Sequence, residues 1–224
     1  MISQKTMELL ISSFPKILEF GLKVTLPLAI IAFILSTVLA VLVAMVQFAE
    51  VPVLKQICRF YIWVIRGTPL LVQLMVAFYG LPLIGIHANP FVMAVIVFTI
   101  NEGAYSAETM RAAMEAVPAG QLEAGYCVGM NFMQIMWHII LPQSFRTAFP
   151  SLFNALISMV KDTSLASSIT VVEMFTRTKQ IAGQSYNYLP LYIEVAIVYL
   201  LFCTVLTFVQ KKGEKILGSY GVRK

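Results

Sequence analysis

Two carboxylates lie beside long apolar stretches of this sequence, and the first of them is Glu102. It follows the apolar run 91–100 and precedes Tyr105 and Ser106 by three and four residues, so the three side chains share one face of a helix. A carboxylate within a bilayer is costly and usually faces a bundle interior or a water-filled path. Glu102 and Tyr105 are therefore candidate pathway residues for a polar solute. The alternative, in which Glu102 ties helices together through hydrogen bonds, stays open.

The second carboxylate, Asp162, stands directly after Lys161 near another apolar run. Neighbouring residues on a helix point about 100° apart, so these two charges are poor partners for each other. Each needs another helix, water or a charged ligand, and Thr163 and Ser164 extend the polar patch. We expect all four residues to line the pathway. An interfacial turn with a snorkelling Lys161 is the alternative.

Neither a catalytic nor a metal centre is indicated by the remaining reactive residues. Cys58, Cys127 and Cys203 lie about seventy residues apart, so we expect reduced, unpaired thiols. His87 lies in a turn without a second ligand at metal spacing. The sequence has no glycine-rich phosphate-binding loop, and its basic residues are too scattered to follow a nucleic acid. We expect no metal, no cofactor bound by this chain, no nucleic acid partner and no enzyme activity.

The composition indicates the elements that must position these residues. Hydrophobic residues make up 59% of the chain and charged residues 12%, whereas soluble domains carry about 25% charged residues. The sequence therefore predicts an all-α polytopic membrane protein. We expect five spans near 24–46, 67–83, 90–110, 150–172 and 189–210, and a linker over 47–66. The fourth span has to include Lys161 and Asp162.

The N-terminal segment 6–23 mixes apolar residues with Lys16, Glu19 and Lys23. It predicts either an amphipathic helix at the membrane interface or a helical lead-in to the first span. The apolar run that follows is too long for a signal peptide, so the first span is expected to be uncleaved.

Five spans place the termini on opposite sides of the membrane. With the N-terminus outside, the cytoplasmic segments hold ten basic residues and the outer segments five, which agrees with the positive-inside rule. The ten are Lys55, Arg59, Arg66, Arg111, Arg146, Lys211, Lys212, Lys215, Arg223 and Lys224. The five are Lys5, Lys16, Lys23, Arg177 and Lys179. This orientation puts the C-terminus and the loop 111–149 in the cytoplasm.

That loop contains a spaced motif. Glu123, Ala124 and Gly125 are followed by Gly129, and after nine more residues by Ile139-Ile140-Leu141-Pro142. The pattern resembles the EAA loop of ABC importer permeases, a cytoplasmic helix-turn-helix that docks into a groove of the ATPase subunit. Gly125 stands where the family usually has alanine.

The residues of the loop support that resemblance independently. Gly129 permits a tight turn with positive φ, Pro142 is expected to end the second helix, and Glu123 is expected near the positive start of the first. Seven apolar side chains are more than a monomer normally exposes: Leu122, Tyr126, Met130, Met133, Ile135, Met136 and Trp137. A partner with a groove would cover them. The alternative is an amphipathic helix on the inner leaflet.

Two further segments resemble polar amino acid permeases. They are Arg66-Gly67-Thr68-Pro69, at the expected start of the second span, and 160–165, which contains Lys161 and Asp162. The resemblance covers about residues 17–213. It implies one transmembrane domain over 1–224, of the type I ABC importer permease kind, with the coupling loop at about 111–149.

The resemblance also implies the partners and the place of this chain. It would pair with a second permease subunit, as a homodimer or a heterodimer, and with ABC ATPase subunits that use ATP and Mg²⁺. An extracytoplasmic solute-binding protein would deliver the substrate. The complex would lie in the cytoplasmic (inner) membrane of a prokaryote, surrounded by the lipid bilayer.

The sequence leaves more than one substrate and more than one transport mechanism open. The residues of the motifs are most similar to those of permeases for cystine, while glutamine, arginine and histidine remain open as substrates. An ion-coupled secondary transporter or channel for small polar solutes could also carry acids within its spans. Uptake that persists after ATP depletion would favour that alternative.

Overall fold

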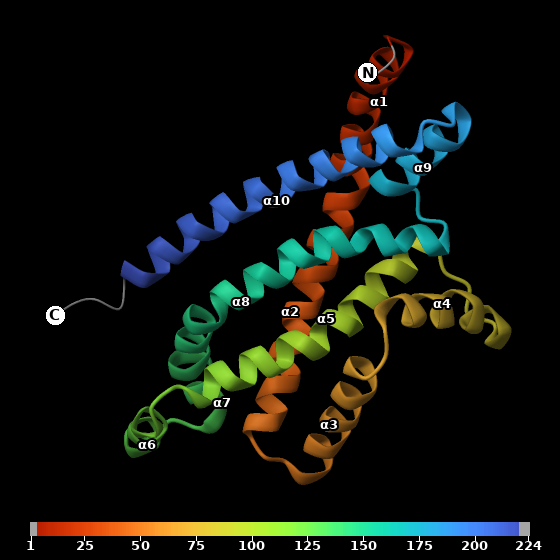
Figure 1. Cartoon of the computed structure of the whole chain (residues 1–224). Helices are drawn as coiled ribbons and strands as arrows, with labels where there is room; N and C mark the ends of the chain where they lie inside the picture. Colours follow the sequence, from red (N-terminus) through yellow and green to blue (C-terminus); the bar gives the residue numbers. More distant parts are fainter. Residues whose placement is uncertain (1–3, 220–224) are drawn as a thin grey trace. The chain divides into compact units, whose positions relative to one another are not determined.

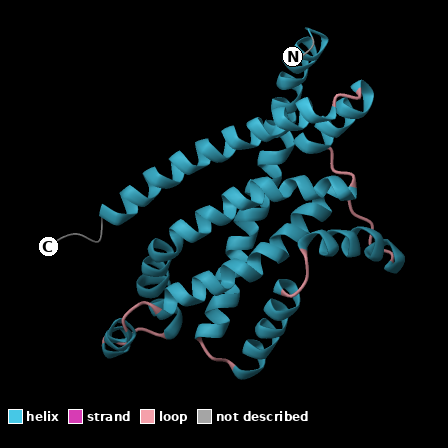
Figure 2. Ribbon diagram, in the orientation of Figure 1, coloured by secondary structure: helices cyan, strands magenta, loops and turns pink. Residues whose placement is uncertain are grey.

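The computed structural model describes residues 4–219, and the part that it describes contains helices and connecting loops without a strand (Figures 1 and 2). The all-α prediction is confirmed. Arg223 and Lys224, counted among the cytoplasmic charges, lie outside the described residues. The helical elements in chain order are α1 (Gln4–Phe20), η1 (Gly21–Thr25), α2 (Leu26–Phe48), α3 (Pro52–Arg66), α4 (Leu70–Gly80), η2 (Leu81–Ile84), α5 (Pro90–Glu115), α6 (Ala119–Cys127), α7 (Phe132–Ile135), η3 (Met136–Ile140), α8 (Leu141–Asp162), η4 (Thr163–Ile169), α9 (Met174–Ser185) and α10 (Tyr188–Ser219).

Helices long and apolar enough to cross a membrane account for the predicted spans. Within the described residues, three qualify alone: Gln4–Phe48, Pro90–Glu115 and Tyr188–Leu217. Two further pairs qualify if each pair counts as one broken span, namely Pro52–Arg66 with Leu70–Ile84 and Phe132–Ile169 with Met174–Ser185. The predicted five spans are therefore the upper value that length and composition allow.

The first span begins earlier than its charge-free core. α1 continues through the π-helical turn η1 into α2, so Gln4–Phe48 is one uninterrupted helical run. Of the two alternatives for 6–23, the helical lead-in matches this arrangement. Ser13 and Ile17 of α1 are buried at 1% and 0% exposure, which ties the segment to the rest of its unit.

The segment 47–66, predicted as a linker between the first two spans, is mostly helix. Pro52 occupies the first turn of α3, where its missing N–H costs nothing, and Val51 before it is extended. The basic residues Lys55, Arg59 and Arg66 lie on one side of this helix. The interruption predicted at Gly67 and Pro69 is confirmed, because α3 ends at Arg66 and α4 begins at Leu70.

Pro142 does not end a helix, contrary to prediction. The chain is helical without a break from Phe132 to Ile169, and Pro142 lies in the first turn of α8 directly after the π-helical turn η3. A π turn bonds each N–H to the carbonyl five residues back, as Leu141 does to Met136, and thereby makes room for a residue that cannot donate. The helix that contains the start of the predicted fourth span therefore begins before 150, and Pro150 lies inside α8.

The first of two compact units comprises residues 4–34, 69–98 and 156–208 of the described chain. Its hydrophobic core contains Leu28, Leu74, Phe98 and Met159, each no more than 3% exposed. Gly21 in η1 lets α10 approach closely, since a Cβ there would lie 2.5 Å from Cε2 of Phe202.

The second unit comprises residues 35–68, 99–155 and 209–219 of the described chain. Its core includes small residues, since Ala104 and Ala107 are fully buried beside Val43 and Ile62. A Cβ on Gly103 would lie 2.8 Å from Cδ2 of Leu39 and 3.0 Å from the hydroxyl of Tyr61. The assignment of residues 1–224 to one transmembrane domain stays a prediction.

Candidate functional site

The loop predicted to couple the chain to a partner is a helix-turn-helix. α6 ends at Cys127, and Gly129 follows with φ +82°, so the predicted positive φ is confirmed. The turn is closed by the backbone bond from Met130 N–H to Gly125 C=O, 3.0 Å. A capping box then starts α7: Asn131 Oδ1 accepts from Gln134 N–H at 2.9 Å, and Gln134 Oε1 accepts from Asn131 N–H at 2.8 Å.

Gly125 is where α6 packs against the following helical run. A Cβ at this position would lie 2.7 Å from Cγ1 and 3.0 Å from Cδ1 of Ile135, closer than real contacts allow. Ile135 is fully buried. The glycine that departs from the usual family alanine is therefore required by the large side chain opposite it.

The apolar side chains of the loop divide into a buried base and an exposed face. Ile135 and Met136, both predicted to be exposed, are at 0% because they pack within the loop and the adjoining helices. The exposed side chains are Tyr126 at 50%, Val128 at 77%, Met133 at 50% and Trp137 at 60%. We call these four the loop face. The predicted apolar surface exists. Three of its four residues were among the seven predicted, Val128 was not, and Leu122 and Met130 are half-buried.

The remaining motif residues serve different purposes. Glu123 is exposed and is the fifth residue of α6, beyond the first turn, so its predicted place at the positive helix end was wrong. Ala124 and Pro142 are exposed, Ile139 is half-buried and Leu141 is 2% exposed. Part of the motif therefore holds the loop together, and part of it is available to a partner.

Glu102 and its helical neighbours belong to the second unit. Ser106 Oγ donates to Glu102 Oε1 at 2.6 Å, which satisfies one carboxylate oxygen within α5. The three residues lie on one helix, as the shared face requires, but Ser106 is 2% exposed while Tyr105 is 43% exposed. The Arg66 guanidinium lies 5.2 Å from the centre of the Tyr105 ring, a cation–π contact. Glu102 and Tyr105 remain pathway candidates.

The segment Arg66-Gly67-Thr68-Pro69 ends α3 through local hydrogen bonds. The Gly67 N–H donates to Trp63 C=O at 3.0 Å, and Thr68 Oγ1 donates to Val64 C=O at 3.0 Å. Pro69 then starts α4 in an extended conformation. The motif is thus structural.

Asp162 is the last residue of α8, in the first unit, and the chain tightens into the 3₁₀ turns of η4 directly after it. Thr163 is fully buried, and its hydroxyl donates to Val160 C=O at 2.7 Å. Ser164 donates to Lys161 C=O at 2.8 Å. Among the ion pairs of the described residues, none joins Lys161 to Asp162.

Lys161 and Ser164 lie on the wall of a groove of about 520 Å³. Its other walls are mainly apolar and aromatic: Phe175, Tyr192, Val195, Ala196, Tyr199, Leu200 and Cys203. All three cysteines of the chain are free thiols. Residues 4–219 contain no cluster of three His, Cys, Asp or Glu side chains that could hold a metal ion.

Two buried carboxylates in the first unit were not singled out from the sequence. Glu173 is 0% exposed and caps α9 by accepting from the N–H groups of Phe175 and Thr176, both at 2.7 Å. It also accepts from the Tyr199 hydroxyl at 3.2 Å. Glu194 of α10 is 8% exposed and accepts from Ser13 Oγ at 2.6 Å. A glutamate inside an apolar helix was the available signal for Glu194; glutamate is an uncommon N-cap residue, which hid Glu173.

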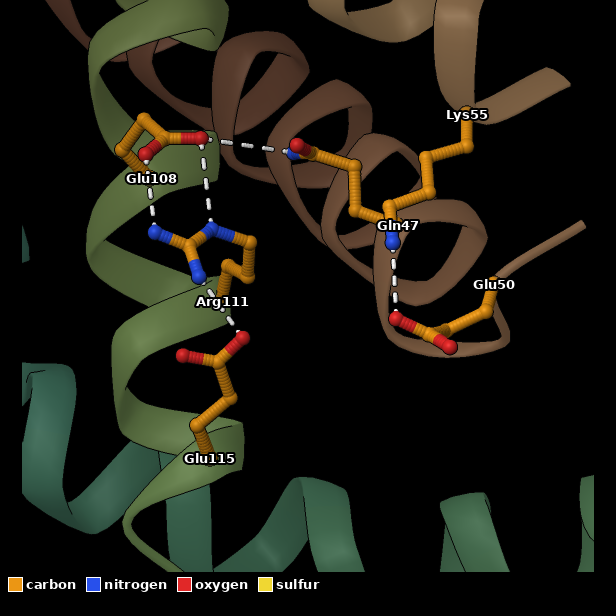
Figure 3. A network of polar contacts seen from close by, with 6 residues as sticks. All are labelled: Gln47, Glu50, Lys55, Glu108, Arg111 and Glu115. Carbon is orange, nitrogen blue, oxygen red and sulfur yellow. Dashed lines mark hydrogen bonds and ion pairs between the residues drawn. The ribbon is translucent and has the colours of Figure 1, made fainter. Parts of the chain in front are cut away.

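A polar network in the second unit was also missed (Figure 3). Arg111 bridges two acids of its own helix, at 3.1 Å from Glu108 Oε2 and 2.6 Å from Glu115 Oε1, and Gln47 of α2 donates to Glu108 at 3.4 Å. The network borders a cavity of about 480 Å³. The i, i+3 and i, i+4 spacings of these charges on α5 were readable from the sequence.

Known proteins resemble this chain over nearly its whole length. A family model described as "binding-protein-dependent transport system inner membrane component" matches residues 36–215. The L-cystine transport system permease protein TcyB of Bacillus subtilis is 42% identical over 214 residues, covering 95% of this chain and 92% of that protein. The arginine transport system permease protein ArtQ of the same organism is 33% identical over 210 residues, covering 93% and 95%.

A solved structure agrees with these relatives. A chain of the crystal structure of an amino acid ABC transporter with histidines matches with a TM-score of 0.78 and 30% identity, covering 94% of this chain and 95% of that one. The resemblance inferred from the loop motif is confirmed. This chain belongs to the binding-protein-dependent transport system inner membrane components, as a membrane-embedded permease of the amino acid ABC transporter type.

Proposed function

We propose that this chain is the subunit through which an ATP-driven importer moves a polar amino acid across the cytoplasmic membrane. The observation that carries the proposal is the helix-turn-helix 119–140, which presents the loop face on a packed base. The fully buried Ile135, wedged against Gly125, holds α6 in place, while Tyr126 and Trp137 are half exposed or more. A fixed apolar helical surface of this kind fits helix-in-groove docking.

The partner of the loop face is proposed to be an ABC ATPase subunit, which uses ATP and Mg²⁺. Its closure would displace α6 and α7 together, because the short turn at Gly129 and the capping box leave little freedom between them. The same proposal places the N-terminus outside and the C-terminus in the cytoplasm, as the distribution of Lys and Arg favours. A second permease copy, as homodimer or heterodimer, and an extracytoplasmic solute-binding protein complete the complex.

Cystine is the substrate that the relatives favour, since the cystine permease TcyB is 42% identical. The arginine permease ArtQ, at 33%, keeps basic amino acids as the competing assignment. Ligand binding by the solute-binding protein that cooperates with this permease, measured by titration calorimetry against cystine, glutamine, arginine and histidine, tests the choice. Preference for an amino acid other than cystine would overturn the substrate assignment and leave the transport role intact.

Substitution of Gly129 tests the coupling role. Gly129→Leu forces a side chain into φ +82°, a strain of about 1–2 kcal/mol, and we expect uptake and ATPase docking to fall while the permease still reaches the membrane. Asn tolerates this conformation, so Gly129→Asn should retain uptake. Gly120→Leu is a matched control, because a Cβ at Gly120 meets open space. Normal docking and uptake by Gly129→Leu would rule out the coupling role.

The pathway residues are tested by removing their charges one at a time. Uptake by the reconstituted complex is compared for Glu102→Gln and Asp162→Asn, with Glu8→Gln, an exposed acid on α1, as the control. We expect a lower rate or affinity for the first two because both carboxylates lie within candidate spans. Unchanged rates and affinities in both would defeat the assignment. Uptake that continues after ATP depletion would favour an ion-coupled transporter instead.

A further inference from the structure

Helix α3 has two faces with opposite properties, and the charged one borders a cavity. Lys55, Arg59 and Arg66 recur at intervals of four and seven residues, so they lie on one side of the helix. All three line the cavity of about 480 Å³ described above. The opposite side is apolar and uncovered: Val53 is 70% exposed, Ile57 59% and Phe60 65%.

The charges within this cavity are paired unequally. Lys55 binds Glu50 at 2.7 Å, and its hydrogen bond and charge hold the pKa of Glu50 below its ordinary value. Arg111 forms ion pairs with both Glu108 and Glu115. Among the ion pairs of the described residues, none includes Arg59 or Arg66. The two guanidiniums retain donors that face the cavity without a carboxylate bound to them.

A cavity with surplus guanidinium donors is suited to an anion, and its rim indicates which kind. Trp63 lines the cavity, is 73% exposed and contacts Phe60 of the apolar side, with 5.9 Å between ring centres. Polar space for a headgroup is thus continuous with an exposed apolar surface for acyl chains. Tryptophan at such a boundary is typical of the membrane interface, and basic pockets between helices on the cytoplasmic side bind acidic headgroups.

We propose that this cavity binds the phosphate headgroup of an anionic phospholipid from the cytoplasmic leaflet. Arg59 and Arg66 bind the phosphate, and the acyl chains lie along Val53, Ile57 and Phe60. The lining holds four basic and three acidic side chains, so its net charge is positive. This net charge attracts an anionic headgroup more strongly than a zwitterionic one, whose own cation cancels the charge of its phosphate. The site rests on the proposed orientation, which places the N-terminal end of α3, shortly after the first span, on the cytoplasmic side.

Quenching of Trp63 fluorescence by brominated lipids measures this binding directly. The chain contains two tryptophans, so Trp137→Phe leaves Trp63 as the reporter. The purified full chain is reconstituted in vesicles of phosphatidylcholine with increasing dibrominated phosphatidylglycerol, or with dibrominated phosphatidylcholine at the same fractions. We expect stronger quenching by the phosphatidylglycerol. Each of Arg59→Gln and Arg66→Gln should weaken the preference about fivefold, the equivalent of ~1 kcal/mol per basic residue.

Lys212→Gln is the matched control, because it removes one exposed basic residue of α10 that does not line the cavity, and it should leave the preference unchanged. Equal quenching by both lipids, or a preference that survives loss of both arginines, overturns the proposal. Absence of quenching by either lipid means that another protein surface, such as a second copy, covers the cavity, and overturns it too. Displacement by millimolar glutamine or arginine assigns the cavity to the transported solute instead.

This readout does not depend on transport. The preference for phosphatidylglycerol can be absent while uptake and ATPase docking behave as proposed. Conversely, a loss of uptake or docking does not contradict a measured lipid preference. Reactivity of Cys58 on α3 toward a membrane-impermeant thiol reagent, added from either side of oriented vesicles, tests the orientation separately.

Discussion

Restoring the usual family alanine at position 125 should damage the loop of this chain. The added Cβ would lie 2.7 Å from Cγ1 of Ile135, and a β-branched side chain has little freedom to turn away. Overpacking of this kind costs about 1–3 kcal/mol, whereas the better helix propensity of alanine returns at most ~1 kcal/mol. We expect Gly125→Ala to weaken the local stability of α6 by about 1–2 kcal/mol.

Truncation of Ile135 should reverse the sign of this effect. Ile135→Ala alone is expected to cost about 2–5 kcal/mol, because Ile135 is fully buried. In that background Gly125→Ala meets no Cγ1, gains helix propensity and fills part of the space, so it should stabilise α6 by about 1 kcal/mol. The four proteins form a double-mutant cycle with a coupling energy well above that of independent sites.

Hydrogen exchange of the α6 amides measures this cycle locally, because exchange reports the opening free energy of a segment. Gly120→Ala is the control within the same helix, since a Cβ at Gly120 meets nothing within 4 Å; it should protect α6 slightly in either background. Protection of α6 by Gly125→Ala in both backgrounds would refute the packing argument. Uptake by the same variants then shows whether a loosened α6 impairs coupling.

Three further predictions concern the loop face and the first unit. Trp137→Ser should lower ATPase docking and uptake at an unchanged unfolding temperature, because Trp137 is 60% exposed; a lower unfolding temperature would make it a structural residue. Glu173→Ala should cost about 1–2 kcal/mol in thermal unfolding, since it removes the cap of α9, and stability equal to the parent would show that the cap is dispensable. Gly21→Ala should cost about 1–3 kcal/mol because its Cβ would meet Phe202 at 2.5 Å. Phe202→Leu should recover most of that loss, and failure to recover it would place the strain elsewhere.

Local signals in the sequence predicted the loop well where the chemistry of one residue decides the backbone. Gly129 was expected at positive φ and is at +82°. Pro142 was misjudged by the same kind of reasoning, because the π turn that accommodates it is not visible in residue types. For 47–66 only a linker was predicted, although the spacing of Lys55, Arg59 and Arg66 fits one face of a helix.

Burial was harder to predict than secondary structure. Ile135 and Met136 were expected to be exposed, since both belong to an apolar loop, yet they pack within it. Thr163 was expected to be accessible to a polar solute, but it is fully buried and its hydroxyl donates to the carbonyl of Val160. Which of several similar side chains faces inward depends on contacts between distant segments, and a sequence pattern does not contain them.

The contact between Ser13 and Glu194 has a consequence for the biogenesis of this protein. The two residues are separated by 181 positions, so α1 enters the membrane long before its partner helix has been synthesised. When α10 follows, the carboxylate of Glu194 would be costly in lipid without a hydrogen-bond donor. Ser13, on the α1 helix that was inserted earlier, supplies that donor. We therefore expect α1 to help α10 to dock in the bilayer. A chain that ends before α10 would lack the Ser13–Glu194 hydrogen bond.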